Sequence, residues 1–170
     1  MGIIVFAFGM GGPLANFAGL LHMVMHSLTK SAIFYAVGYI SQVKGTQRIS
    51  KIRGLTVTHP ALGWSLIVGV AAIAGLPPLG IFMSEFLVVS STFARAPMLA
   101  IILVFGLLIA FGALTLRLTS LAFGEPRGSK ASANASYVPM FAHLSLVLVA
   151  GIYLPSPLVA WFQHVARLLG

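Results

Sequence analysis

Residues 20–40 read LLHMVMHSLTKSAIFYAVGYI, an apolar run that contains three ionisable side chains, His22, His26 and Lys30. Their spacing is i, i+4 and i+8, so in an α-helix successive members lie only about 40° apart around the axis. They form one polar stripe roughly 12 Å long at 1.5 Å of rise per residue. The stretch predicts an apolar helix with a single ionisable stripe, and the rest of the chain indicates what surrounds that helix.

The composition indicates an integral membrane protein. The chain has 170 residues, of which 59% are hydrophobic and only 7% are charged, and its mean hydropathy is +1.03. About a quarter of the residues of an ordinary soluble domain are charged, so this chain cannot cover itself with a solvated surface. Disorder is excluded for the opposite reason, because too much apolar surface would stay in water. We expect an all-α integral membrane fold.

The few charges are strongly unbalanced, with ten Lys and Arg against two acids, Glu85 and Glu125. In a soluble protein a pI near 10.7 would indicate a nucleic-acid-binding function. Here the bases gather in short loops between apolar runs, which is a pattern of membrane topology, so no nucleic-acid partner is expected. The chain has no cysteine, which excludes disulfides, iron–sulfur clusters and thiolate metal sites within it. Any electron-transfer chemistry must belong to partners.

The apolar runs predict about four transmembrane passes, preceded by a partial helix and followed by an amphipathic tail. Residues 1–13 are too short to span a bilayer and lack the features of a signal peptide, so we interpret them as the end of a helix that begins earlier in a longer protein. The tail, 155–170, carries Trp161, Phe162 and Arg167 and is expected at the membrane interface. The predicted spans, within a transmembrane domain of residues 1–154, are about 14–43, 60–93, 97–122 and 137–154.

The second span is too long for one straight helix. A continuous helix over 60–93 would measure roughly 50 Å, against a hydrocarbon core of about 30 Å. Its middle reads Gly75-Leu76-Pro77-Pro78-Leu79-Gly80, and two consecutive prolines remove two backbone donors. We expect two half-helices joined by an irregular segment near 75–80, which survives at membrane depth only when it is buried in protein or lines a wet cavity. A simple kink is the alternative.

The distribution of basic residues predicts the orientation. Positively charged loops stay in the cytoplasm, which places loops 44–59 and 124–136 there. The opposite side holds only Arg95 and, in the tail, Arg167. The bases of the two cytoplasmic loops are Lys44, Arg48, Lys51, Arg53, Arg127 and Lys130.

The ionisable stripe points to proton chemistry. A lysine as deep as Lys30 costs at least about 2.5–3.5 kcal/mol on insertion scales, and such groups are usually functional. A buried lysine can bind and release a proton as its surroundings change, and a histidine can pass a proton between two ring nitrogens. The three side chains therefore predict part of a proton path. Interhelical hydrogen bonding is the structural alternative. A metal site is less favoured, because His22-x-x-x-His26 lacks the glutamate of a zincin motif.

Glu85 follows the proline break and is the only acid in an apolar segment. Discontinuous helices that bring ionisable groups to the midplane are typical of ion-coupled transporters, and a half-helix start would favour a carboxylate through its dipole. A polar group that merely packs is the alternative. Arg117 and His143 are secondary candidates. Arg117 lies close enough to the cytoplasmic end of its span to reach water, and His143 lies within the last span.

Three stretches together resemble one family. HMVMHSLTKSAIFYAVG (22–38) resembles the histidine–histidine–lysine helix of the antiporter-like subunits of respiratory complex I, of multisubunit cation/proton antiporters and of membrane-bound [NiFe] hydrogenases. VKGTQRISKIRGL (43–55) resembles the loop that follows it, and AAIAGLPPLGIFMSEFLV (71–88) resembles the family's broken helix with its terminal charged residue. The sequences of these stretches are most similar to component F of hydrogenase-4 and formate hydrogenlyase-type complexes.

The resemblance implies a role and partners. Members contain two inverted five-helix repeats, and this chain resembles only their last third. It implies that Lys30 is the central proton-carrying lysine, that His22 and His26 connect along the hydrated axis, and that Glu85 ends a half-channel toward the periplasm. It also implies a bacterial inner-membrane location, other membrane-arm subunits as neighbours, and a peripheral arm that holds the nickel–iron, iron–sulfur or quinone chemistry.

Three functions remain open at this point. The first is a non-redox, proton-translocating subunit of a redox-driven complex, of the hydrogenase-4/formate hydrogenlyase or NADH-quinone oxidoreductase type. The second is a subunit of a multisubunit Na⁺/H⁺ antiporter. The third is a purely structural membrane subunit.

Overall fold

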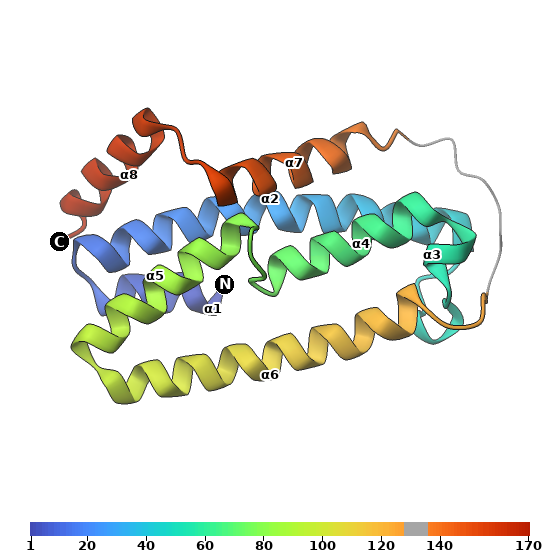
Figure 1. Cartoon of the computed structure of the whole chain (residues 1–170), viewed down its shortest axis with the longest axis horizontal. Coiled ribbons are helices and arrows are strands. Elements are labelled where there is room, and N and C mark those ends of the chain that lie inside the picture. Colours follow the sequence, from blue (N-terminus) through green and yellow to red (C-terminus); the bar gives the residue numbers. More distant parts are fainter. Residues whose placement is uncertain (128–135) are drawn as a thin grey trace.

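The computed structural model describes residues 1–127 and 136–170, and its regular elements there are all helices. The all-helical prediction is confirmed for this part of the chain. The predicted loop 124–136 falls mostly between the two ranges, so its Lys130 lies outside the described residues. Figure 1 shows most helices running along the long axis of the molecule, with α2 (Pro13–Lys44) reaching from one end to the other.

The helix that carries the ionisable stripe is the centre of the bundle. A proline at its first position and the left-handed Gly45 after its last residue mark the ends of α2. α1 (Gly2–Met10) precedes it, and the positive φ values of Gly11 and Gly12 turn the chain back so that α1 packs along α2. Gly19 permits this approach, since a Cβ there would lie 3.2 Å from the side chains of Ala7 and Phe8.

The predicted span 60–93 is divided into two helices. A short link made of η1 (Ile49–Lys51) and α3 (Leu55–Thr58) leads to α4 (Pro60–Ile73), which ends just before Gly75. The chain is then non-helical until α5 (Gly80–Arg95) begins. In Figure 1 the two helices follow one another along the long axis, so that together they match the length of α2. The prolines thus interrupt the helix without reversing the chain.

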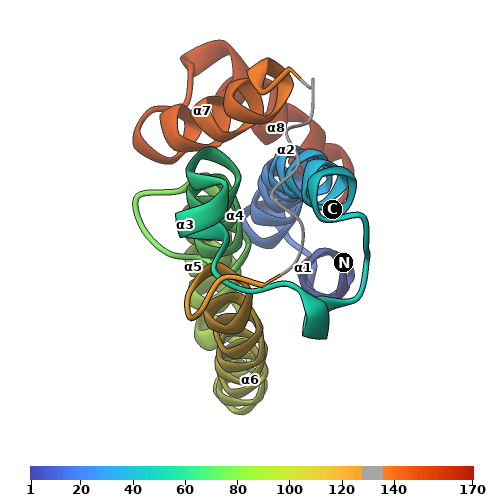
Figure 2. The same ribbon diagram turned by 90° about the vertical axis from the view of Figure 1, so that its right-hand side faces the viewer.

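The last three helices flank this centre. α6 (Pro97–Ala122) runs along one side with most of its side chains exposed, as Figure 2 shows at the edge of the bundle. α7 (Val138–Ile152) and α8 (Ser156–Leu168) lie on the opposite side and meet at an angle of 79°. α8 buries Phe162 against α2, where its ring meets Phe17 edge-on at 6.1 Å.

Length and hydropathy identify fewer spans than the sequence predicts. Among the described helices, α6 alone is both long and apolar enough to cross a membrane by itself. α7 and α8 meet this description only as a bent pair, and α4 is apolar but short. These properties therefore do not establish four separate passes.

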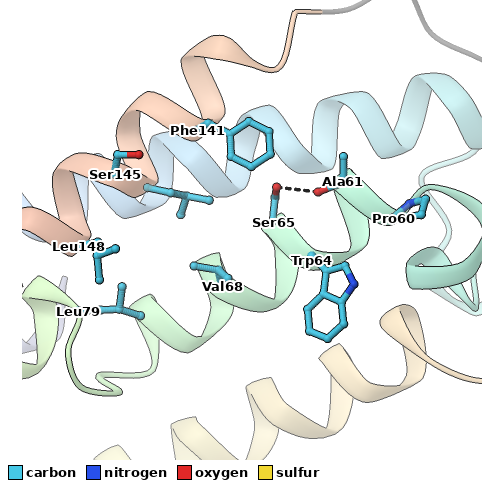
Figure 3. A pocket seen from close by; sticks show the side chains of 10 residues that line it. Pro60, Ala61, Trp64, Ser65, Val68, Leu79, Phe141, Ser145 and Leu148 are labelled. Carbon is cyan, nitrogen blue, oxygen red and sulfur yellow. Dashed lines mark hydrogen bonds between the residues drawn. The ribbon is translucent and has the colours of Figure 1, made fainter.

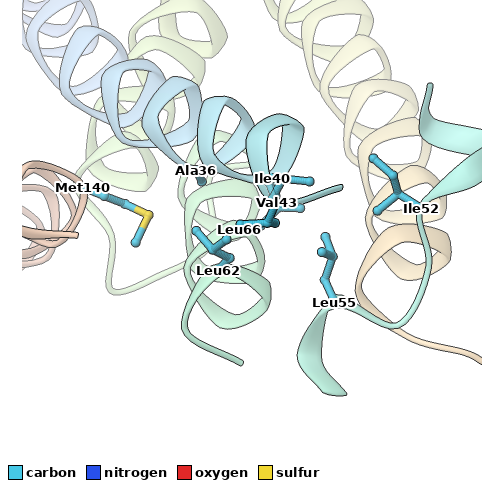
Figure 4. Packing of buried hydrophobic residues seen from close by; sticks show 8 residues of the cluster. All are labelled: Ala36, Ile40, Val43, Ile52, Leu55, Leu62, Leu66 and Met140. Carbon is cyan, nitrogen blue, oxygen red and sulfur yellow. The ribbon is translucent and has the colours of Figure 1, made fainter. Parts of the chain in front are cut away.

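A tight cluster closes the end of the bundle where the basic loops lie. Figure 4 shows side chains from α2, α4, α7 and the link between α2 and α4 packed together: Ala36, Ile40, Val43, Ile52, Leu55, Leu62, Leu66 and Met140. Beside this cluster the loops themselves join, as the Arg127 amide donates to the Arg53 carbonyl (3.2 Å) and the Gly54 amide to the Phe123 carbonyl (3.3 Å).

Lys44 corrects one sequence-based expectation. We expected it in the solvated basic loop, but it is the last residue of α2 and only 4% exposed. Its ammonium group donates to the Thr58 hydroxyl (3.1 Å) and to the Arg127 carbonyl (3.2 Å). A buried ammonium needs such acceptors, so Lys44 fastens the end of α2 to both loops.

Candidate functional site

One cavity brings three of the predicted site residues together. His22, His26 and Glu85 line a space of about 490 Å³ bounded by α1, α2, α5, α6 and the end of α4. The rest of its wall is almost entirely apolar. An apolar wall lowers the local dielectric, which strengthens the electrostatic interactions between ionisable groups that face the same space.

The two histidines lie one turn apart on α2 and face the same way. Their rings stack with centroids 5.6 Å apart and planes inclined by 29°. His22 is the deeper of the two, with 1% of its surface exposed, and its Nδ1 lies 2.9 Å from the Ser84 hydroxyl oxygen on α5. His26 is half-buried. The i, i+4 spacing therefore places the two imidazoles in contact, as the sequence suggests.

Glu85 lies against the non-helical segment between α4 and α5. Its carboxylate packs on Gly75, whose φ of +71° is in the left-handed region, and a Cβ at Gly75 would collide with that carboxylate. Glycine is thus required at position 75 for two reasons: it adopts the left-handed backbone conformation easily, and it has no side chain to collide with Glu85. One expectation changes here. Glu85 is in the second turn of α5, beyond the first turn where the helix dipole acts, so the dipole does little for this carboxylate.

Close backbone contacts hold the non-helical segment in place. A Cβ at Gly80 would lie 3.2 Å from the Val147 carbonyl of α7 and would meet the Met25 sulfur of α2. A Cβ at Gly151, near the end of α7, would overlap the Pro78 carbonyl oxygen. Pro77 and Pro78 themselves are exposed. The segment is therefore wedged between α2 and α7 on its inner side, which fixes where α5 starts and where Glu85 points.

Lys30 does not join the cavity. It lies on the exposed face of α2, where its ammonium nitrogen is 6.0 Å from the Phe34 ring centre. The drift of about 40° per turn explains this, because it carries the stripe from the buried His22 through the half-buried His26 to the exposed Lys30. The stripe is continuous along the helix, but only its first two members face the inside of this chain.

The two secondary candidates lie apart from the cavity. Arg117 is exposed on α6. His143 on α7 is half-buried, and its Nδ1 donates to the Pro139 carbonyl at 2.6 Å, since a carbonyl only accepts. The His143 ring lies 5.8 Å from the ring of Tyr35. These contacts indicate local packing for His143.

A second cavity, of about 370 Å³, lies between α4 and α7 (Figure 3). Apart from Ser65 and Ser145 its labelled wall is apolar, and the Ser65 hydroxyl already donates to the Ala61 carbonyl at 2.6 Å. None of the described residues that line it could take up a proton near neutral pH. Across residues 1–127 and 136–170, no three His, Asp or Glu side chains come together as metal ligands.

Sequence reasoning missed Ser84. It is fully buried, touches His22, and precedes Glu85 directly in the chain. A hydroxyl just before the only acid in an apolar segment was the available signal. Its significance depends on the pairing of α2 with α5, which the sequence does not reveal.

Comparisons with known proteins agree with these observations. A family model described as "NADH:quinone oxidoreductase/Mrp antiporter, TM" matches residues 1–110. The chain is 63% identical over 169 residues to the hydrogenase-4 component F homolog of Methylacidiphilum infernorum, covering 99% of this chain and 36% of that protein. Thus it spans little more than a third of that curated relative.

Two solved assemblies contain chains of similar fold. One is respiratory complex I of Thermus thermophilus with bound NADH, with a TM-score of 0.82 and 27% identity over 99% of this chain and 37% of the other. The other is the Mrp complex of Dietzia sp., with a TM-score of 0.83 and 18% identity over 99% of this chain and 40% of the other. At that identity the second likeness concerns the fold alone.

Proposed function

Because the chain belongs to the NADH:quinone oxidoreductase/Mrp antiporter transmembrane family, we propose that it is the part of a membrane-arm subunit that moves protons in a redox-driven complex. The observation that carries the proposal is the cavity in which His22, His26 and Glu85 meet. Three titratable groups from three turns of two helices share one apolar-walled space of about 490 Å³. Such a space has room for several waters, at about 30 Å³ each, that can link them.

The proposed path runs along the stripe. Glu85 exchanges protons at the non-helical segment, His22 and His26 carry them along α2, and Lys30 receives them one turn farther on. An exposed ammonium in the middle of a membrane helix costs at least about 2.5–3.5 kcal/mol, so we propose that protein covers the Lys30 face of α2 in the complete subunit. The relatives' greater length supports this, since this chain matches little more than a third of one.

Protons fit this cavity better than sodium ions. Na⁺ is a hard cation that prefers several oxygen ligands, as Ca²⁺ and Mg²⁺ do. The cavity's ionisable side chains are one carboxylate and two imidazoles, and imidazole nitrogens suit protons and softer metals. A Na⁺/H⁺ antiporter subunit remains the alternative that the transport test separates.

We propose four membrane passes: α2, α4 with α5, α6, and α7. α2, α6 and α7 run along the long axis in Figure 1, with α4 and α5 following one another beside them, and α6 is long and apolar enough by itself. Loops 44–59 and 124–136 then face the cytoplasm of a bacterial inner membrane. The joined backbones of Arg53 and Arg127 support a common side for both loops. α8, with Phe162 on α2 and Trp161 outward, lies at the opposite interface.

The proposed partners follow from the family. Other membrane-arm subunits flank the chain, and a peripheral arm holds the nickel–iron, iron–sulfur or quinone chemistry. The complex is of the hydrogenase-4 or formate hydrogenlyase type, a choice that the 63% identity to a hydrogenase-4 component F homolog supports.

Proton pumping by the intact complex tests the proposal. We expect Glu85→Gln and Lys30→Ala to reduce protons moved per turnover at least tenfold. The chain offers matched controls, because Glu125→Gln and Lys51→Ala remove the same groups from exposed loop positions and should leave pumping unchanged. Full pumping in both site variants would refute the assignment. Loss of assembly on deleting α7 and α8, with both site variants active, would instead favour a structural subunit. Sodium-dependent exchange in everted vesicles without redox substrate would favour the antiporter.

A further inference from the structure

The hydroxyl group of Ser84 has its only hydrogen committed to the backbone. Ser84 Oγ lies 2.8 Å from the Ile81 carbonyl oxygen, one turn back on α5. A carbonyl oxygen can only accept, so the serine hydrogen points to it. Ser84 is fully buried, so no bulk solvent offers this hydroxyl another arrangement.

The same oxygen lies 2.9 Å from Nδ1 of His22. With its hydrogen already given to Ile81, Ser84 Oγ can only accept in this second contact. With the serine hydrogen on the Ile81 carbonyl, Nδ1 of His22 is the donor of this contact and carries the hydrogen. A neutral imidazole has one N–H, and the other nitrogen, Nε2, is then the acceptor.

We propose that Ser84 is a positioning residue that holds His22 in its Nδ1-protonated tautomer, so that His22 exchanges protons only through Nε2. This deepens the proposed function and rests on it for the role of His22, although the tautomer can be measured without it. A histidine that relays a proton through its ring takes it at one nitrogen and releases it at the other. Here Nδ1 faces an oxygen whose own proton is engaged. His22 thus binds and releases its exchangeable proton at a single nitrogen, Nε2.

The arrangement also links the histidine to the non-helical segment. Ile81 is the second residue of α5, and Gly80 before it is wedged between Met25 and Val147. The orientation of the Ser84 hydroxyl depends on that first turn of α5. The protonated nitrogen of His22 on α2 is therefore set by the backbone that follows the prolines.

Solid-state nitrogen NMR of the assembled complex in membranes, with ¹⁵N-histidine, tests the proposal. The His22 signal is assigned by its loss in His22→Gln, at about pH 8 where a histidine is neutral. We expect the proton on Nδ1 in the unaltered complex. Ser84→Ala should shift the tautomer ratio toward Nε2–H by about fivefold, the size of one neutral hydrogen bond. Ser84→Thr keeps the hydroxyl and should keep the ratio.

Ser91→Ala is the matched control. Ser91 is buried on the same helix and donates to the carbonyl three residues back, Val88, at 3.0 Å. It should leave the His22 ratio unchanged. An Nε2-protonated His22 in the unaltered complex would overturn the proposal without any variant, as would equal shifts in Ser84→Ala and Ser91→Ala. Pumping by Glu85→Gln decides the proposed function separately, since the tautomer readout needs no transport.

Discussion

Replacing Gly151 by alanine places one methyl group against the segment on which the candidate site depends. The added Cβ would overlap the Pro78 carbonyl oxygen and would come within 2.8 Å of the Leu79 carbonyl carbon and the Gly80 nitrogen. All three are backbone atoms. They cannot rotate away as the end of a side chain can, so either α7 or the whole segment between α4 and α5 must shift.

The expected cost combines two effects of opposite sign. Overpacking a close contact costs about 1–3 kcal/mol, whereas Gly→Ala within a helix gains up to about 1 kcal/mol. For Gly151→Ala we expect a net loss of roughly 1–2 kcal/mol in unfolding free energy. Gly112 on α6 is the matched control, because a Cβ there meets nothing within 4 Å. Gly112→Ala should stabilise by up to about 1 kcal/mol, so the two variants should change stability in opposite directions.

Denaturing-detergent titration of the full-length subunit, followed by far-UV circular dichroism, measures both variants. Proton pumping should fall in Gly151→Ala, because a displaced segment moves Glu85 with it, and should be normal in Gly112→Ala. Equal stability changes in the two variants would refute the close packing of α7 on the segment. A stability loss with unaltered pumping would show that the position of the segment does not govern the site.

Three further predictions follow from other contacts. Asn16→Ala removes the side-chain amide that donates to the carbonyl oxygens of Ala166 (3.3 Å) and Gly170 (3.0 Å). It should lower the unfolding free energy by about 1–3 kcal/mol, measured as faster proteolysis of α8. Lys44→Met removes the charged donor to Thr58 and to the second basic loop, and should cost about 2–3 kcal/mol in the detergent titration. Gly75→Ala places an alanine in a left-handed backbone conformation, which costs about 1–2 kcal/mol, and adds a Cβ that collides with Glu85. It should reduce proton pumping more than assembly of the complex, and equal losses of both would contradict this.

The local features of the site were predictable because they depend on helix geometry and on proline. The i, i+4 spacing is enough to place His22 and His26 ring against ring. Two consecutive prolines are enough to interrupt a helix, and the chain is non-helical between Ile73 and Gly80. Both arguments need only neighbours in sequence.

What depends on helix pairing was not predictable. The sequence does not show which members of the His22–His26–Lys30 stripe face the inside of the bundle. The exposed position of Lys30, outside the cavity that holds the histidines, was therefore not predictable. Ser84 acquires its meaning only when α5 packs on α2. Lys44 looked like one more loop cation, although two acceptors distant in sequence make its burial possible.

The joined backbones of Arg53 and Arg127 bear on how the protein is made. Between them the chain passes through α4, α5 and α6, so the contact cannot form until the ribosome has synthesised all three helices. In the proposed arrangement these helices amount to one crossing in each direction. A chain with one of the two crossings left out would end with Arg53 and Arg127 on opposite faces of the bilayer. In the proposed arrangement the contact is therefore compatible only with molecules in which both crossings are in place.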